Sequence, residues 1–219
     1  YIRMEVQIFK PENIDVSRIS YSTPYPKKGG RIVYINYIND DSEKVNFVIK
    51  TPIMNNPFGL NTSSSWSSVN LQFTPNQKSL KNAIDSIDDK LIYDIDRFSY
   101  KWKTDEKEYK HSIYTSQNDC NAKDENNKII NNCNNFMRAN IYKDSDGKYD
   151  VSLFDTNHNL LDIGAITSGC RLSSILELVG IFISDTNNTI SPQWRLYQAV
   201  VYPSNNIIRG KCIIDSDSD

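Results

Sequence analysis

The stretch VNLQFTPNQKSLKNAIDSIDDKLIYDID, residues 69–96, joins a strand pattern to the most regular helix pattern in the chain. Apolar residues alternate in VNLQF, as they do on one face of a strand. Pro75 then ends the strand, because proline has no N–H to donate to a sheet. Beyond it, apolar residues recur every three or four positions and form one stripe of an α-helix: Leu80, Ile84, Ile87, Leu91 and Ile95. The pattern predicts one long helix after a strand.

Strand patterns dominate on both sides of this helix. Residues 31–40 and 44–50 alternate around a turn at Asp40 and predict a hairpin, and 136–155 predicts another around the turn at 144–147. Three more strands are expected at 160–164, 173–184 and 194–203. Residues 171–179 also fit a short helix, but the β-branched and aromatic run 181–183 favours a strand. About seven strands and one helix predict an all-β barrel or sandwich, and a small barrel closes its edges best.

Two polar segments interrupt these strands. The Pro57-Phe58-Gly59 turn and the serines that follow it predict a loop between strands. Residues 98–116 alternate aromatic and basic side chains, and 118–135 are rich in asparagine without periodicity, which is typical of a loop or connector.

Composition limits the classes of function. The 219 residues are enough to bury a real core, and the net charge of −2 excludes nucleic-acid binding by bulk charge alone. The sequence contains no apolar run of the roughly 20 residues needed to cross a bilayer and no signal-peptide pattern at its start. We therefore expect a soluble intracellular protein that does not bind membranes. Its four widely spaced cysteines are expected to be free thiols.

The residues that carry enzyme chemistry are few. His111 and His158 have no partner at metal-ligand spacing, and no phosphate-binding glycine motif or nucleophile elbow occurs. The helix carboxylates Asp85, Asp88 and Asp89 are more typical of a solvated face than of a metal site. We therefore predict no catalysis, no metal and no cofactor. A metal-dependent nuclease that uses Asp85 and Asp89 is a less favoured alternative, which magnesium-dependent cleavage would reveal.

Aromatic residues next to cations are the strongest functional signal. The chain has 13 tyrosines, and several aromatic side chains lie close in sequence to Lys or Arg. Aromatic rings stack on bases while a cationic groove follows the phosphates of a single strand. The alternative is that the tyrosines pack on the helix or a loop. The residues predicted to bind nucleic acid are Arg31, Tyr34, Lys50, Lys101, Trp102, Lys103, Arg138, Tyr142, Arg195 and Tyr197.

Strand alternation predicts which faces these side chains occupy. Arg138 and Tyr142 share a face with Phe136, opposite a core face of Met137, Ala139 and Ile141. On the last strand, Arg195 and Tyr197 share a face opposite Trp194 and Leu196. A shift of one residue would exchange these faces.

The order of the segments resembles a known viral family. KTPIMNNPFGLN, VNLQF, the long helix, a polar insertion, RANIYKDSDGKYDVSLFD, ITSGCRLSSILELVGIFIS and PQWRLYQAVVY follow one another as in the single-stranded-DNA-binding proteins of nucleocytoplasmic large DNA viruses, which include the African swine fever virus protein. The resemblance covers most of 31–202. Its most specific positions are the segment 52–59 and Gly180, Trp194 and Gln198. The chain departs from the family at 189–192, where a Phe-Gly turn would be expected.

The resemblance implies a mainly β fold, an OB-fold-like β-barrel with one long inserted α-helix and long polar loops. It implies an N-terminal extension (1–30), a nucleic-acid-binding domain (31–203) with a polar insertion at about 98–135, and an acidic C-terminal tail (204–219).

The function implied is sequence-nonspecific binding of single-stranded DNA in viral DNA replication, recombination or repair. RNA is a second candidate ligand. The acidic end IIDSDSD resembles tails that recruit replication proteins, and a homo-oligomer is a further expectation. The expected location is intracellular, at the viral replication site in the host cytoplasm, or in the virion. The alternative is a structural or assembly protein of a large DNA virus without nucleic-acid activity, whose outer tyrosines pair with another subunit.

Overall fold

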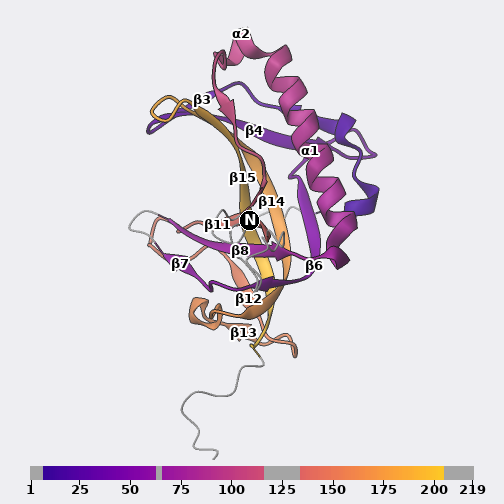
Figure 1. Ribbon diagram of the computed structural model, residues 1–219, viewed down its shortest axis with the longest axis vertical. Coiled ribbons are helices and arrows are strands. Elements are labelled where there is room, and N and C mark those ends of the chain that lie inside the picture. The colour runs from indigo at the N-terminus through magenta and orange to yellow at the C-terminus, as the bar shows by residue number, and fades with distance from the viewer. Residues whose placement is uncertain (1–6, 63–65, 116–133, 205–219) are drawn as a thin grey trace, which may run out of the picture.

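The computed structural model describes residues 7–62, 66–115 and 134–204, which form a mainly β fold with one long helix (Figure 1). The helices are α1 Lys78–Arg97 and α2 Ser99–Trp102, with 3-10 turns at Pro11–Asn13, Val16–Arg18, Pro75–Gln77 and Ile163–Ala165. The strands are β1 Ile8–Phe9, β2 Ile19–Tyr21, β3 Tyr25–Lys27, β4 Gly30–Ile38, β5 Lys44–Val45, β6 Val48–Asn56, β7 Asn61–Thr62, β8 Ser67–Phe73, β9 Glu108–Tyr109, β10 Ile113–Thr115, β11 Asn135–Ile141, β12 Ser152–Phe154, β13 Leu160–Leu161, β14 Cys170–Ser184 and β15 Thr189–Tyr202.

Five strands pair with one another in a closed ring. β6 pairs with β8, β8 with β11, β11 with β15, β15 with β14, and β14 with β6. Of these contacts only the one between β11 and β15 is parallel. When the five strands are numbered by their order in the chain, their order around the ring is first, second, third, fifth and fourth. Strands that are distant in sequence therefore become neighbours, β11 and β15 among them.

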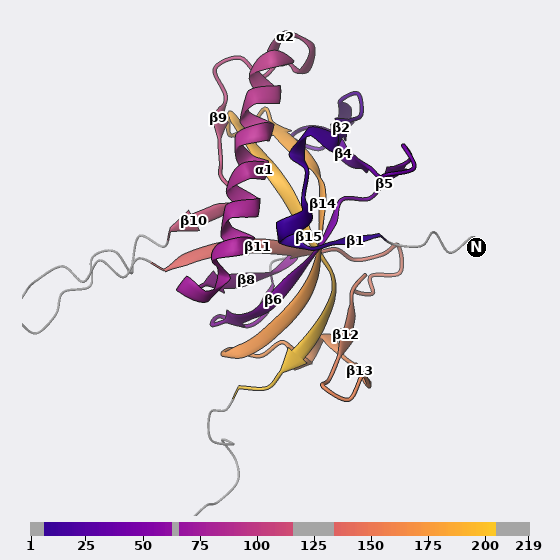
Figure 2. The same cartoon turned by 90° about the vertical axis from the view of Figure 1, so that its right-hand side faces the viewer.

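The long hairpin of β14 and β15 extends beyond this ring at both ends (Figure 1). At one end β4 pairs with β14 and carries β2, β3 and β5, and at the other β12 pairs with β15 and carries β13. In the view turned by 90°, α1 lies along one side of the strands, while β12 and β13 lie near the bottom (Figure 2).

Both hairpins predicted from local alternation pair differently. β4 pairs with residues 180–184 of β14 and β6 with residues 170–177, so the two strands follow one another along the same edge of β14. Residues 31–50 therefore do not form one hairpin, although a short turn does pair β4 with β5. β11 and β12 likewise follow one another along one edge of β15, at Arg195 and at residues 198–200, and one bridge, between Lys143 and Tyr149, flanks the predicted turn at 144–147. β14 and β15 are long enough to pair with several strands, and they replace the short local partners.

The strand prediction for 171–184 is confirmed by β14, which is continuous across that segment. The strand predicted at 160–164 is confirmed only at Leu160 and Leu161, because a 3-10 turn begins at Ile163.

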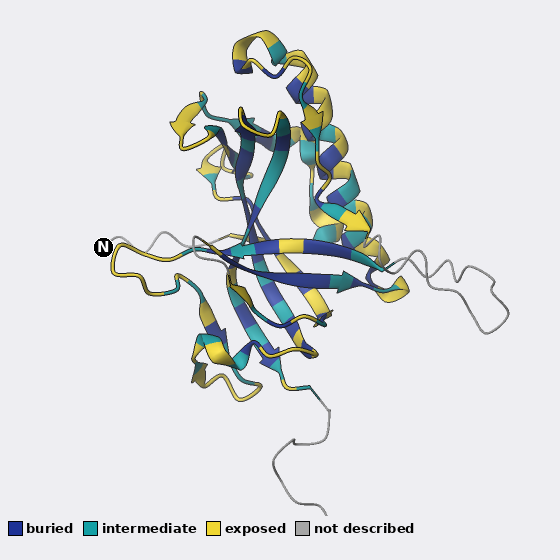
Figure 3. Ribbon diagram, turned by 60° about the vertical axis from the view of Figure 1, so that its left-hand side comes forward, coloured by how far each residue is buried: buried dark blue, intermediate teal, exposed yellow. Residues whose placement is uncertain are grey.

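The predicted helix stripe is confirmed in α1. Leu80, Ile84, Ile87 and Leu91 are at most 1% exposed and join the hydrophobic core that the sheet strands form. Figure 3 shows buried and exposed residues alternating along this helix, as expected for an amphipathic element. Burial of each such aliphatic side chain contributes about 1.5 to 3 kcal/mol. The packing against the sheet therefore stabilises the helix.

Segments outside the ring also pack on it. β1 runs parallel to β6, β2 pairs with β4, and Ile19 is buried. Residues 98–115 of the predicted polar insertion form α2, β9 and β10, whereas 116–133 lie outside the described residues, as do 205–219 of the predicted tail. The division into extension, domain and tail remains a prediction.

Candidate nucleic-acid interface

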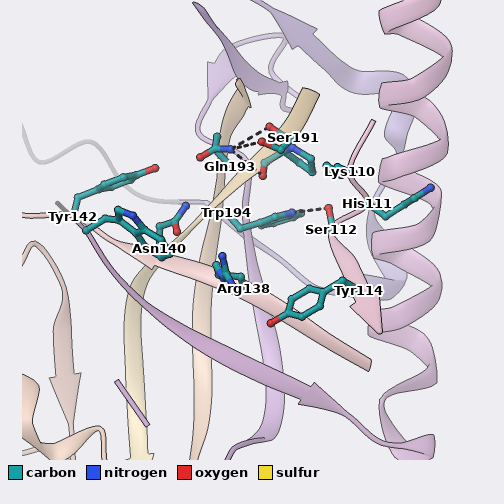
Figure 4. Close-up of a pocket in the computed structure, with 12 residues that line it drawn as sticks. Lys110, His111, Ser112, Tyr114, Arg138, Asn140, Tyr142, Ser191, Gln193 and Trp194 are labelled. Atoms are coloured by element: carbon teal, nitrogen blue, oxygen red, sulfur yellow. Dashed lines mark hydrogen bonds between the residues drawn. The ribbon is translucent and has the colours of Figure 1, made fainter. Parts of the chain in front are cut away.

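A groove of about 530 Å³ lies where β11 and β15 meet the segment 110–114 and the start of β8 (Figure 4). Its lining mixes aromatic rings, cations and neutral polar groups. The residues are Trp66, Lys110, His111, Ser112, Tyr114, Arg138, Asn140, Tyr142, Ser191, Pro192, Gln193 and Trp194.

The predicted faces of β11 are confirmed. Met137, Ala139 and Ile141 are fully buried, whereas Arg138 is exposed and lines the groove. Phe136, on the same face as Arg138, is buried because the rings of Phe58 and Tyr114 lie beside it, with centroids 5.4 and 6.0 Å away. The alternation of β11 therefore directs Arg138 outward.

Arg138 lies close to two aromatic rings. Its guanidinium carbon is 5.4 Å from the ring centre of Trp66 and 5.9 Å from that of Tyr114. Both rings stay accessible, at 40% and 36% exposure, and the Tyr114 hydroxyl donates to Oδ1 of Asn70 at 2.9 Å. No carboxylate among the described residues forms an ion pair with Arg138. An accessible cation beside two rings can attract a phosphate while the rings accept bases.

A second arginine lies between two rings on the neighbouring strand. Arg195 of β15, which pairs in register with Asn140, has its guanidinium carbon 5.9 Å from the ring centre of Tyr142 and 5.5 Å from that of Tyr197. The predicted face is confirmed, because Trp194 and Leu196 are buried on the other side. Unlike Arg138, Arg195 forms ion pairs with Asp150 and Glu177, at 2.5 and 3.4 Å.

Burial affects two ionisable groups near this second arginine. It raises the pKa of Tyr142, although the hydrogen bond with Asn140 and the positive charge of Arg195 oppose that rise. Burial also raises the pKa of Glu177, although Arg195 opposes that rise. Tyr142 is therefore neutral at physiological pH, as a stacking ring should be.

One buried carboxylate holds the wall formed by 110–114. Asp88 of α1 accepts hydrogen bonds from the backbone N–H of Ser112 (2.7 Å), from its hydroxyl (2.7 Å) and from the hydroxyl of Tyr109 (2.9 Å). The Ser112 hydroxyl in turn accepts from Nε1 of Trp194 at 2.9 Å (Figure 4). Burial raises the pKa of Asp88, while the donated hydrogen bonds and His111 oppose the rise.

The prediction that Asp88 lies on a solvated helix face is wrong, because it is only 2% exposed beneath the 109–112 segment. Asp85 forms an ion pair with Lys81 at 2.6 Å. Across 7–62, 66–115 and 134–204, no group of three or more His, Cys, Asp or Glu side chains is arranged to hold a metal ion.

Two of the predicted site residues, Arg138 and Tyr142, line the groove, and Arg195 and Tyr197 adjoin it through the contact of Arg195 with Tyr142. Tyr34 is 37% exposed, lies beside Tyr25 with ring centres 5.7 Å apart, and is near enough to Tyr142 to contribute to the raised pKa of that residue. Lys50 is exposed on β6, where its register partner is Ile175 of β14.

The remaining predicted residues lie elsewhere. Trp102 is 2% exposed and packs against Tyr21 and Phe98, so its ring cannot stack on a base, which corrects the expectation from its lysine neighbours. Arg31 points to the opposite face of β4 from Tyr34 and bonds to the carbonyl of Lys103 and to Asp185. Lys101 and Lys103 are exposed on and after α2.

Ten residues that line the groove were not among the predicted binding residues: Trp66, Lys110, His111, Ser112, Tyr114, Asn140, Ser191, Pro192, Gln193 and Trp194. Trp66 follows the serine tract without a neighbouring cation, and its partner Arg138 is distant in the chain. The alternation of Ile113, Tyr114 and Thr115 was the one available signal for Tyr114.

Two further expectations can be compared with the described part of the chain. Cys170 is a buried free thiol, and the other three cysteines lie outside the described residues. Among the helices described, none has the length and apolar character that crossing a membrane requires.

The chain was compared with protein families, curated proteins and solved structures. No family model matches the chain, and no curated protein matches its sequence. Among solved structures, the chain is similar to gp2.5, a single-stranded DNA binding protein encoded by bacteriophage T7, with 9% sequence identity and a TM-score of 0.49. The alignment covers 80% of this chain and 98% of that one. A likeness at this level does not define a shared activity, and membership of the large-DNA-virus family remains a prediction.

Proposed function

We propose that this protein binds single-stranded DNA without sequence preference, in viral DNA replication, recombination or repair. The observation that carries the proposal is the position of Arg138 beside the accessible rings of Trp66 and Tyr114 in an open groove. A single strand offers unstacked bases to such rings and phosphates to such a cation, whereas a duplex keeps its bases stacked inside.

The strand arrangement supports the same proposal. A closed five-stranded ring in the order first, second, third, fifth, fourth is consistent with an OB-fold-like Greek-key barrel, with α1 inserted between its second and third strands. OB folds bind oligonucleotides on one face of the barrel. The groove lies on the outer face of β11, the third ring strand, beside residues 191–194 of β15, the fifth.

The proposed protein is a binder and not an enzyme. The groove around Arg138 offers ring faces, a guanidinium group and neutral amides, which can bind a single strand without transferring a proton or a group. We also propose that the acidic segment 213–219 recruits replication proteins and that the protein forms a homo-oligomer. Its proposed location is the host cytoplasm or the virion.

Fluorescence anisotropy with labelled single-stranded DNA, single-stranded RNA and duplex DNA of equal length tests the function. We expect oligo-dT to bind more tightly than the duplex. The slope of log affinity against log salt concentration should be about −0.7 for each phosphate contacted. RNA binding as tight as DNA binding would widen the ligand class. Self-association without affinity for any probe would instead support the structural or assembly protein.

A further inference from the structure

The two arginines of the interface differ in their charge environment. Arg138 has no carboxylate partner among the described residues, whereas Arg195 contacts both Asp150 and Glu177. The side chain of Arg195 is 19% exposed, and that of Glu177 is 12% exposed. Glu177 is also the register partner of Arg195 across β14 and β15, so the backbone pairing itself brings this pair together.

This environment is unsuitable for a phosphate. Arg195 and Asp150 alone sum to zero charge, and an ionised Glu177 makes the cluster negative. A phosphate near Arg195 would therefore meet carboxylates held within 3.4 Å of the guanidinium. Like charges at such distances repel one another more strongly where water is partly excluded.

The same environment is suitable for holding aromatic rings. The carboxylates fix the guanidinium, and the guanidinium lies 5.9 and 5.5 Å from the ring centres of Tyr142 and Tyr197. A cation at that distance is attracted by the ring faces. Tyr197 remains 36% exposed and can accept a base.

We infer that the interface has a backbone end at Arg138 and a base end formed by Tyr142, which lines the groove, and by Tyr197 across Arg195 from it. Arg195 is a positioning residue at the base end: it orients both rings for stacking and does not contact phosphate. This inference rests on the proposed binding of single-stranded DNA. It specifies which end of the interface binds the phosphates of the DNA and which end binds its bases.

The double substitution Arg195→Gln with Glu177→Gln tests the inference, because it removes one positive and one negative charge together. We expect the affinity for labelled oligo-dT to fall roughly 5-fold or more, the loss that corresponds to one weakened base stack. We expect the slope of log affinity against log salt to stay at the wild-type value. Arg138→Gln is the matched control, and its slope should become shallower by about 0.7.

Two results would overturn the inference. One is a double variant whose salt slope becomes shallower by the same amount as that of Arg138→Gln, since Arg195 would then be a phosphate contact. The other is a folded double variant with wild-type affinity. A wild-type protein that fails to bind oligo-dT would contradict the proposed function itself, which keeps the two failures distinct.

Arg195→Lys keeps the test decisive if the double variant does not fold. Lysine retains the charge and can pair with Asp150, but it lacks the planar group that lies against two rings. The positioning role predicts that the variant loses affinity as the double variant would, with an unchanged salt slope. Wild-type affinity for Arg195→Lys would show that the charge alone matters and would overturn the inference.

Discussion

Asp88 in the middle of α1 and Ser112 beside the groove are joined by two hydrogen bonds of 2.7 Å, one from the Ser112 backbone N–H and one from its hydroxyl. Ser112 also accepts from Trp194, so a single carboxylate connects the helix to the segment 110–114 and to β15. The helix inserted between β8 and β11 is therefore part of the support of the proposed interface as well as part of the core.

Replacing Asp88 with alanine should weaken both the fold and the binding of single strands. The Ser112 N–H and the hydroxyls of Ser112 and Tyr109 would lose their acceptor, and a buried donor without a partner costs about 1 to 3 kcal/mol. Urea unfolding and oligo-dT anisotropy measure the two losses. Asp88→Asn should lose less, because its one amide oxygen can still accept from the two hydroxyls, although its amide nitrogen cannot accept from the Ser112 N–H. An alanine variant with unchanged stability would contradict the anchoring role.

The raised pKa of Asp88 predicts a specific dependence of stability on pH. Since burial raises this pKa in the folded state above the ordinary value of 3.8, the folded protein binds more protons than the unfolded chain between the two values. The contribution of Asp88 to the free energy of unfolding therefore falls as the pH rises from 3.8 through the folded pKa. Above the folded pKa this contribution stays constant. The free energy of unfolding of Asp88→Asn, measured relative to wild type, should rise across this window. A difference that is flat or falls with pH would contradict the prediction.

The double change Arg138→Ala with Tyr142→Ala should weaken single-strand binding by about 1 to 3 kcal/mol per lost base stack, with a shallower salt slope. The fold should survive, because Arg138 is exposed and Tyr142 is only partly buried. Thermal melting and oligo-dT titration are read on the same sample. Met137→Ala, on the opposite face, should instead lose about 2 to 5 kcal/mol of stability. A stable double variant with wild-type affinity would remove this face from the site.

Gly180→Ala should destabilise the protein strongly. A Cβ at this position would lie 2.3 Å from the carbonyl oxygen of Val33, where β14 passes from its partner β6 to its partner β4. The matched control is Gly164→Ala, since a Cβ there meets nothing within 4 Å. We expect a clear fall in melting temperature for the first variant and little change for the second. Equal melting temperatures for the Gly180→Ala and Gly164→Ala variants would show that β4 can shift without loss of stability.

Replacing residues 118–133 with a short Gly/Ser linker should leave the fold intact. β10 and β11 pair antiparallel up to Thr115 and Asn135, so the two ends to be joined are already neighbours. The replacement stops at residue 133 because Asn135, the last residue of the asparagine-rich stretch, belongs to β11. Circular dichroism melting checks this prediction, and a large fall in melting temperature would show that the removed residues contribute to the core.

Local periodicity alone determined several features of this protein. The stripe from Leu80 to Ile95 determined α1, and alternation determined that Arg138 and Met137 occupy opposite faces of β11. These predictions succeeded because the repeat of 3.6 residues in a helix and of two in a strand is a property of neighbouring residues.

Only the tertiary structure decided which strands pair and therefore which side chains meet. Alternation assigns a residue to a face but does not identify the strand beside it, so the pairing of β4 and β6 with successive segments of β14 could not be predicted. The same long-range pairing brings Trp66 next to Arg138 and neutralises Arg195 with Asp150 and Glu177, while Trp102 is buried by contacts with Tyr21. Each of these contacts joins residues far apart in the chain, and whether a ring or a charge reaches solvent depends on such contacts.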